Sequence, residues 1–316
     1  MAHFLRETDF SPEQTASILD LAADLKANRG RPFDSPIQGT SWGLVFAKSS
    51  TRTRVSFEVG LHELGANPIY LEQRSLQVER GESLADTAEV LSRYLHGLIV
   101  RCHGHEVVEA FAEYGTVPVI NALTDFLHPC QIYSDAFTLS ERWGDGTDRL
   151  GSLAGRKIAF FGDCSSNMAH SWILGAAHFG MRISLAGPAA FKPRPEIDQA
   201  LSDAGLPSEY HFTTDPKEAA RDAEMLYTDV FVSMGREAEG AARLEKMRPY
   251  GVTMDLLEVA KSDACFMHCL PAHLGEEVDA DVFNSPQSIV YDQAENRLHV
   301  QKAILVALAS AKPVLA

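Results

Sequence analysis

Short apolar runs alternate along this chain with segments in which apolar residues recur every three to four positions. The short runs predict buried strands, and the recurrent spacing predicts amphipathic helices. A capping box with proline at the first helical position, Ser11-Pro12-Glu13-Gln14, predicts where the first helix begins. The strands expected next are 43–46, 68–71, 97–100 and 117–120, and the helices lie near 53–64, 84–95, 105–114 and 131–142. This order is typical of a parallel sheet covered by helices.

The alternation restarts after a polar, glycine-rich segment, Trp143-Gly144-Asp145-Gly146-Thr147-Asp148, which is the best linker candidate. The strands expected in the second half are 157–161, 182–186, 225–228, 265–269 and 288–291, and the helices are 167–179, 194–204, 215–221 and 294–311. The pattern therefore predicts an α/β protein with two doubly wound parallel-sheet domains. A cleft is expected between them at the carboxyl ends of their strands, where ligands bind in such folds.

Bulk properties narrow the class of protein. The chain has 316 residues, which suggests two domains of about 150 residues each. It is 45% hydrophobic and 22% charged, as expected of a soluble globular enzyme, and no run approaches the roughly 18 apolar residues of a membrane span. The N-terminus has no signal-peptide pattern, and the five scattered cysteines fit free thiols in a reducing cytoplasm. The net charge of −15 argues against nucleic acid and anionic membranes as partners.

An anion site is predicted at Ser50-Thr51-Arg52-Thr53-Arg54, between the strand 43–46 and the helix that follows. The first turn of a helix offers unpaired N–H groups and partial positive charge, while hydroxyls and guanidinium groups add donors that fit phosphate oxygens. The simpler alternative is a capped helix with solvated arginines. Arg54 lies one position further into the helix, where we expect it to brace the loop or to pair with an acidic neighbour.

Further polar residues follow the predicted strands. They are Arg101, His128, Gln131, Asp163, Asn167, Asp229, Ser233, His268, Cys269 and Arg297. Each has a simpler explanation by itself: His128 and Asp229 as caps, Cys269 as a small buried hydrophobe, and Arg297 as a surface helix residue. Their joint position at strand ends favours a single site.

Five motifs together resemble the ornithine branch of the aspartate/ornithine carbamoyltransferase family. They are Ser-Thr-Arg-Thr-Arg at 50–54, His128-Pro129-x-Gln131, Asp229-x-x-x-Ser233-Met234-Gly235, His268-Cys269-Leu270-Pro271 and Glu295-Asn296-Arg297. The resemblance extends from about Leu5 to Ala311. It implies a carbamoyl-phosphate-binding domain over residues 1–142, an ornithine-binding domain over 150–292, and a C-terminal helix, 293–316, that packs back on the first domain.

The resemblance implies a transfer of the carbamoyl group from carbamoyl phosphate to the δ-amine of L-ornithine, in arginine synthesis or citrulline breakdown. The implied carbamoyl-phosphate ligands are Ser50, Thr51, Arg52, Thr53, Gln77, Arg101, His128, Gln131, Cys269, Leu270 and Arg297. The first four would hold the phosphate, and Gln77 would reach it from a neighbouring subunit. Arg101 and His128 would donate to the carbonyl oxygen. Gln131 would accept from the carbamoyl NH₂, and Arg297 would close over the group.

The implied ornithine ligands are Asn167, Asp229, Ser233 and Met234. Asn167 and Met234 would hold the amino-acid end, and Asp229 would pair with the α-ammonium. Ser233 and Cys269 would face the δ-amine, which must lose a proton before it attacks. The implied catalytic set is Arg101, His128, Cys269 and Asp229. The resemblance implies a homotrimer, with higher oligomers of trimers open, and neither cofactor nor metal.

The sequence departs from the family pattern at two places. Cys164-Ser165-Ser166 stands where glycine and a second asparagine are usual, which bears on the turn before Asn167. Leu274 replaces a common arginine, and we expect this change to affect a loop contact.

Other functions stay open at this point. Aspartate, putrescine or N-acetylornithine could replace ornithine as the amine, although no basic groups for a second carboxylate stand out. Cys265-x-x-His268-Cys269 with His273, or Cys102-His103-x-His105, could hold zinc, but alternation along a strand would point His268 away from the cysteines. A dinucleotide-binding oxidoreductase is disfavoured because Phe161-Gly162-Asp163-Cys164 lacks the later glycines of the fingerprint. A catalytically inactive binding protein also remains open.

Overall fold

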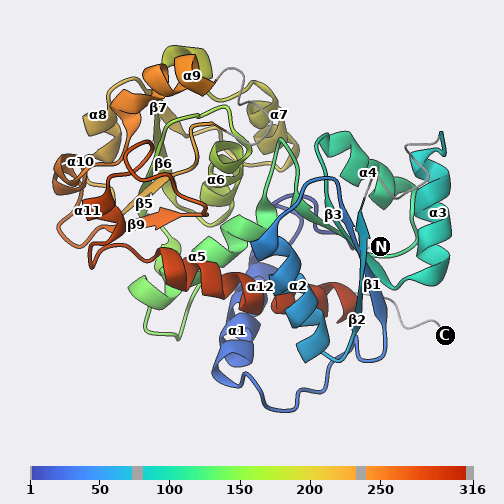
Figure 1. The fold of residues 1–316 in the computed structure, drawn as a ribbon. Helices are drawn as coiled ribbons and strands as arrows, with labels where there is room; N and C mark the ends of the chain where they lie inside the picture. Colours follow the sequence, from blue (N-terminus) through green and yellow to red (C-terminus); the bar gives the residue numbers. More distant parts are fainter. Residues whose placement is uncertain (1, 73–80, 233–239, 311–316) are drawn as a thin grey trace. The chain divides into compact units, whose positions relative to one another are not determined.

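The computed structural model describes residues 2–72, 81–232 and 240–310, and the chain divides into two compact units. Unit 1 comprises Met1–Leu150 together with Glu295–Ala316, and unit 2 comprises Gly151–Ala294. Each unit has its own parallel sheet with helices packed against it (Figure 1). The predicted α/β class with two parallel sheets is therefore confirmed.

Unit 1 is built on a four-stranded parallel sheet in the order β2-β1-β3-β4. Its strands are β1 (Ser41–Phe46), β2 (Asn67–Glu72), β3 (Gly97–Arg101) and β4 (Val119–Leu123). Its helices are α1 (Pro12–Ala27), α2 (Thr51–Glu63), α3 (Leu84–Tyr94), α4 (His105–Tyr114), α5 (Pro129–Trp143) and most of α12 (Val290–Ser310). Helices α3 and α4 cover one face of the sheet, and α1, α2 and α12 lie on the other (Figure 1).

Local sequence explains why these elements form. Strands β1 and β3 are apolar almost throughout and are buried on both faces, as expected for a parallel sheet. The capping box at Ser11 forms as predicted, and the hydroxyls of Ser50 and Ser83 cap α2 and α3. Under α3 and α4, the strand residues Val45 and Val100 belong to one buried apolar cluster.

The chain reverses its direction of winding between β1 and β3, the two central strands of unit 1. From β1 it moves outward to β2 and then crosses to β3 on the opposite side of β1. The carboxyl ends of β1 and β3 lie side by side, because Phe46 pairs with Arg101 and Ala47 N donates to Arg101 O at 2.8 Å. Such a switch point is where ligands bind in open α/β sheets.

Unit 2 repeats this architecture with a five-stranded parallel sheet in the order β7-β6-β5-β8-β9. Its strands are β5 (Lys157–Phe161), β6 (Arg182–Ala186), β7 (His211–Thr213), β8 (Met225–Thr228) and β9 (Cys265–His268). Its helices are α6 (Asn167–His178), α7 (Glu196–Asp203), α8 (Pro216–Ala220), α9 (Gly240–Met247), α10 (Met254–Val259) and α11 (Ala280–Phe283). The switch point lies between β5 and β8, where Phe161 pairs with Thr228 and the Thr228 hydroxyl donates to Phe161 O at 2.9 Å.

The last helix, α12, returns to unit 1 as predicted. Lys302 Nζ lies 2.7 Å from Glu63 Oε2 on α2, and Asn296 Oδ1 accepts from Lys26 Nζ on α1 at 2.9 Å. These buried or half-buried polar contacts fix the helix against the helices of that unit.

The predicted strand over 288–291 is wrong. Ser288 makes one isolated bridge to Phe266, and α12 begins at Val290 rather than near residue 294. Already at Gln293 the backbone N–H donates to Ile289 O, the helical pattern. A short apolar run such as Ile289-Val290 does not distinguish a strand from the buried start of a helix.

The remaining differences concern short elements. Strand β4 lies two residues later than predicted, and β9 ends at His268, one residue early. Strand β7 and helices α9, α10 and α11 were not predicted; they have three to eight residues each, too few for a clear periodic pattern.

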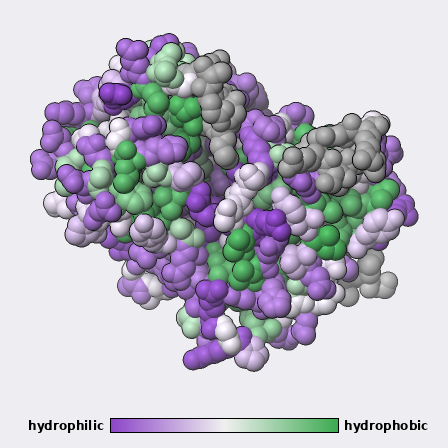
Figure 2. Space-filling view, in the orientation of Figure 1, coloured by the Kyte–Doolittle hydropathy of each residue, from purple (hydrophilic) through white to green (hydrophobic). Residues whose placement is uncertain are grey.

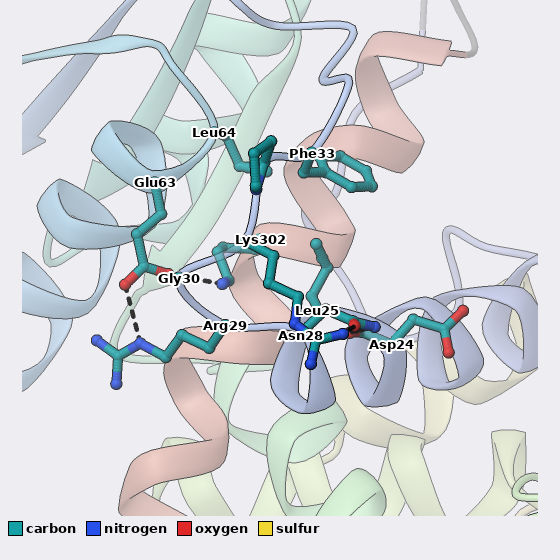
Figure 3. Close-up of a pocket in the computed structure, with 11 residues that line it drawn as sticks. Asp24, Leu25, Asn28, Arg29, Gly30, Phe33, Glu63, Leu64 and Lys302 are labelled. Carbon is teal, nitrogen blue, oxygen red and sulfur yellow. Dashed lines mark hydrogen bonds and ion pairs between the residues drawn. The ribbon is translucent and has the colours of Figure 1, made fainter.

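Figures 2 and 3 show one face of the surface and one pocket of unit 1. Hydrophilic residues cover most of the face in Figure 2, and apolar residues form separate patches. The pocket in Figure 3 belongs to unit 1, next to the end of α1, and none of the predicted site residues lines it. Its wall carries the carboxylate of Glu63, already paired with Arg29 at 2.9 Å and Lys302 at 2.7 Å. Among the described residues, no helix is both long and apolar enough to cross a membrane.

The contact between β1 and β3 gives a stability prediction. A Cβ added at Gly97 would stand 2.2 Å from the ring of Trp42, which is fully buried. We expect Gly97→Ala to lower the free energy of unfolding by about 1–3 kcal/mol, the usual cost of overpacking, as measured by urea denaturation. Gly240→Ala is the matched control, because a Cβ there would meet only ordinary contacts at 3.7 Å. Equal stability of the two variants would contradict the prediction.

Candidate active site

The first turn of α2 carries the residues for which the sequence predicts an anion site. Ser50 is the N-cap residue, and its hydroxyl accepts from Thr53 N at 3.3 Å and donates to Thr53 Oγ1 at 3.0 Å. The side chains of Thr51 and Arg52 are exposed at this turn. The end of the helix therefore presents hydroxyls, a guanidinium group and backbone N–H groups together.

Two further guanidinium groups converge on the same turn. Arg101, at the end of β3, donates from Nη1 to Thr53 Oγ1 at 3.4 Å, and Arg297 on α12 donates from Nη2 to the same oxygen at 3.4 Å. Both arginines are buried. The interpretation of Arg297 as a surface helix residue is therefore wrong. Guanidinium groups from β3 and α12 thus bring positive charge to the Thr53 hydroxyl on α2, although the three elements are far apart in the sequence.

His128 lies beside this cluster at the start of α5. It is the N-cap residue of that helix, but its side chain makes no capping hydrogen bond, so the capping alternative is wrong. Burial lowers the pKa of His128 well below its usual value of 6.5, and the charges of Arg297 and Arg101 lower it further. At neutral pH the imidazole is therefore neutral, with one N–H donor and one acceptor nitrogen.

Gln131 completes the cluster from the first turn of α5. Its Oε1 accepts from Arg297 Nη1 at 2.6 Å, and its Nε2 donates to Asp135 Oδ1 at 2.8 Å. The structure thus brings together Thr53, Arg101, Gln131 and Arg297 by direct contact.

Arg54 points to other partners, as expected. Its Nε donates to Glu58 Oε1 at 2.8 Å, one helical turn further on, and its guanidinium lies 3.8 Å from the centre of the Tyr70 ring. These contacts tie α2 to β2 and direct Arg54 away from Ser50 and Thr53.

A second group of predicted residues meets in unit 2, at the ends of β8 and β9. Cys269 Sγ donates to Asp229 Oδ1 at 3.2 Å, and the same oxygen accepts from Val230 N at 2.8 Å. Burial raises the pKa of Asp229, while the neighbouring His268 and the thiol hydrogen bond act against that rise. The Cys269 thiol makes a hydrogen bond to a carboxylate, so the interpretation of Cys269 as a small buried hydrophobe is wrong.

Buried polar residues fix the segment that carries Cys269 and Leu270. Leu270 N donates to His268 Nδ1 at 2.8 Å, and His268 Nε2 lies 3.3 Å from Glu277 Oε1. His268 N donates to Gln293 Oε1 at 2.9 Å. Leu270 has a φ of 60°, the left-handed region that leucine rarely adopts, and its peptide bond to Pro271 is cis. The backbone at Leu270 is held in an unusual conformation next to the thiol.

The turn before Asn167 is well formed despite its departure from the family pattern. Asp163 Oδ1 accepts from both the backbone N and the hydroxyl of Ser165, and Ser166 caps α6, of which Asn167 is the first residue. Arg243 forms a buried ion pair with Asp163. Serines thus supply the turn and cap interactions at this position, and Leu274 is exposed in its loop, as expected.

Three predicted ligands cannot be placed. Gln77, Ser233 and Met234 lie outside the described residues.

Comparison with known proteins now decides the family. The model for the carbamoyl-P binding domain of aspartate/ornithine carbamoyltransferases matches residues 2–141, and the model for their Asp/Orn binding domain matches residues 154–308. The chain belongs to the aspartate/ornithine carbamoyltransferase family.

Individual members of the family match over nearly the whole chain. The ornithine carbamoyltransferase of Methanoculleus marisnigri is 47% identical over 310 residues, 96% of each chain. The solved structure of the ornithine carbamoyltransferase from Pyrococcus furiosus superposes with a TM-score of 0.89 at 42% identity, covering 98% of both chains. The anabolic enzyme from Campylobacter jejuni has a TM-score of 0.89 at 35% identity, covering 99% of this chain and all of the other.

The residue sets suggested for zinc are not brought together as complete sets, but the ligating atoms of His268 and Cys269 do lie close together, so the expectation that His268 points away from this cysteine is wrong. Among the described residues, the groups with metal-ligating atoms close together are Asp229, His268 and Cys269, and His273, Glu276 and Glu277. Cys265 belongs to neither group, and neither do Cys102, His103 and His105. Both ring nitrogens of His268 already face protein groups, Leu270 N and Glu277.

Two residues at the carbamoyltransferase-family site escaped the sequence analysis. Asp135 and Gln301 are buried, and each lies four positions after a predicted site residue on the same helix, Gln131 and Arg297. With its amide oxygen turned toward Arg297, Gln301 accepts from Nη2 at 2.7 Å and Nε at 3.1 Å. The i, i+4 spacing was the signal that could have found both.

The low pKa of His128 gives a prediction about stability and pH. The unfolded chain binds a proton at His128 below pH 6.5, whereas the folded chain does not until a lower pH. The free energy of unfolding should therefore fall as pH drops below 6.5. In His128→Gln this slope should be shallower by up to about 1.4 kcal/mol per pH unit, as measured by urea denaturation between pH 5 and 9. The two slopes should agree above pH 7.5; identical slopes below pH 6.5 would refute the prediction.

Proposed function

We propose that this enzyme is an ornithine carbamoyltransferase, which converts carbamoyl phosphate and L-ornithine into L-citrulline and phosphate. The observation that carries the proposal is the meeting of Arg101 and Arg297 at the Thr53 hydroxyl, on the first turn of α2. This charge arrangement fits a small dianion with a reactive carbonyl group. The names of the relatives, ornithine carbamoyltransferases at about 45% identity, support the same reaction.

In this proposal the residues 1–142 form the carbamoyl-phosphate-binding part. Ser50, Thr51, Arg52 and Thr53 hold the phosphate, aided by the partial positive charge of the helix end. The phosphate leaves at the end of the reaction, so donors that match its growing negative charge lower the barrier.

Arg101 and His128 donate to the carbonyl oxygen, on which negative charge develops when the amine attacks. The neutral imidazole of His128 has one N–H for this purpose. Gln131 accepts from the carbamoyl NH₂ through Oε1, and Arg297, already bonded to that oxygen, lies against the same group. Cys269 and Leu270 are the remaining proposed ligands of carbamoyl phosphate.

Residues 150–292 form the ornithine-binding part. Asn167 and Met234 bind the amino-acid end, Asp229 pairs with the α-ammonium, and Ser233 and Cys269 face the δ-amine. A free amine has a pKa near 10.4, so at neutral pH it must first lose a proton. In this proposal the Cys269 thiol, which donates to Asp229, presents its sulfur to the amine.

The proposed chemistry is a direct displacement. The lone pair of the δ-nitrogen forms the new C–N bond, the C–O bond to phosphate breaks, and the nitrogen releases one proton. Asp229, whose pKa is raised by burial, is a base within hydrogen-bonding distance of the thiol and suits the transfer of that proton. Carbamoyl transfer requires the residues proposed to bind carbamoyl phosphate and those proposed to bind ornithine to act on the same two bound substrates.

We further propose a homotrimer in the cytoplasm, in which Gln77 of each chain serves the phosphate site of a neighbour. All five cysteines are free thiols, which is in keeping with a reducing compartment. Sedimentation equilibrium of the purified chain measures the oligomeric state, and a monomer would refute this part.

The amine specificity is the first test. We expect citrulline and phosphate to form from carbamoyl phosphate with L-ornithine, and little product with putrescine, N-acetylornithine or aspartate, because Asp229 and Asn167 serve an α-amino acid. A colorimetric citrulline assay and a phosphate assay give the rates. Equal turnover of putrescine would overturn the assignment of the amine while leaving the carbamoyl-phosphate half in place.

Removing one oxyanion donor is the second test. Arg101→Met should lower kcat by about 10²–10³, the usual cost of losing such a donor. Arg54→Met is the matched control, since Arg54 contacts Glu58 and Tyr70, and it should retain kcat within about threefold. Steady-state kinetics at saturating ornithine compare the two, and similar losses in both variants would contradict the role given to Arg101.

A further inference from the structure

The carboxamide of Gln131 is held at both ends by charged, buried side chains. Nε2 donates to Asp135 Oδ1 at 2.8 Å, and Oε1 accepts from Arg297 Nη1 at 2.6 Å. Asp135 is fully buried, and Gln131 and Arg297 are nearly so. Gln131 and Asp135 are one turn apart on α5, so the helix itself keeps them within reach.

The chemistry of the two partners allows a single orientation of the amide. A carboxylate accepts hydrogen bonds and a guanidinium group donates them, so the NH₂ must face Asp135 and the oxygen must face Arg297. In the flipped orientation the amide oxygen would stand 2.8 Å from a carboxylate oxygen in a site of low dielectric. Asp135 and Arg297 therefore place the amide oxygen of Gln131, a hydrogen-bond acceptor, on the side that faces Arg297. They keep the NH₂ donor on the other side.

We infer that Asp135 is a positioning residue that makes the site selective for an acyl phosphate with an N–H donor on its carbonyl carbon. This inference rests on the proposed function, in which Gln131 Oε1 accepts from the carbamoyl NH₂. Arg297 must share that oxygen with the substrate, so Asp135 is the partner that keeps the amide oriented during binding. Acetyl phosphate has a methyl group in place of NH₂, so it cannot donate a hydrogen bond to Gln131 Oε1.

Asp135→Asn tests this role with almost no change in shape. Asparagine can turn either its oxygen or its NH₂ toward Gln131, so the charge no longer fixes the orientation and the hydrogen bond becomes a neutral one. We expect kcat/KM for carbamoyl phosphate at saturating ornithine to fall about tenfold, the effect of roughly one hydrogen bond. The inhibition constants of acetyl phosphate and inorganic phosphate should change less than about twofold.

Three controls separate positioning from general damage to α5. Ser134→Ala removes the hydroxyl of the preceding buried residue, which donates to the Cys130 carbonyl, and should leave the ratio of carbamoyl to acetyl phosphate affinity unchanged. In a Gln131→Ala background, Asp135→Asn should have no further effect on that ratio, because its partner is gone. Thermal unfolding checks that each variant is folded, and Asp135→Ser replaces Asp135→Asn if the latter is not.

The outcomes are distinct. If the unmodified enzyme forms no citrulline, the proposed function fails. If it is active but Asp135→Asn weakens carbamoyl phosphate, acetyl phosphate and phosphate alike, or if its effect persists without the Gln131 amide, the positioning role of Asp135 is refuted.

Discussion

The candidate site of unit 1 is built around two buried guanidinium groups, Arg101 and Arg297, that meet one hydroxyl at the start of α2. Like charges repel, and the end of the helix adds partial positive charge, so this arrangement is most stable when an anion lies beside it. The chain as a whole carries a net charge of −15, which would repel a phosphate at long range. The proposed binding of phosphate therefore relies on this local concentration of charge around Thr53.

Backbone topology is what makes the convergence possible. In each sheet the winding reverses between two central strands, β1 and β3 in unit 1 and β5 and β8 in unit 2. Residues that follow these strands are left beside one another at the carboxyl edge, with helix N-termini pointing toward the same place. Arg101 ends β3 and Asp229 follows β8, so both residues are positioned at the ends of strands, as the proposed mechanism requires of groups that meet a reacting atom.

Buried polar contacts then determine the chemical state of each group. Burial, and then the charges of the two arginines, lower the pKa of His128, and Asp135 and Arg297 hydrogen-bond the two ends of the Gln131 amide. In unit 2 a thiol donates to a carboxylate, next to a backbone segment held by buried hydrogen bonds. In both units, the buried neighbours of each group thus influence which donors and acceptors it can offer.

The sequence by itself determined the class of fold, most elements and the identity of most candidate residues, because strand and helix periodicity and strand-end chemistry are local signals. It did not separate a strand from a helix start at 288–291, where the apolar run was too short. It also left open whether Arg297 is a surface residue, and it gave no role to Asp135. Only the tertiary structure decided these points, since the bond from Arg297 to Gln131 joins residues 166 positions apart. Such a contact depends on how α12 returns to unit 1, and no local pattern encodes that path.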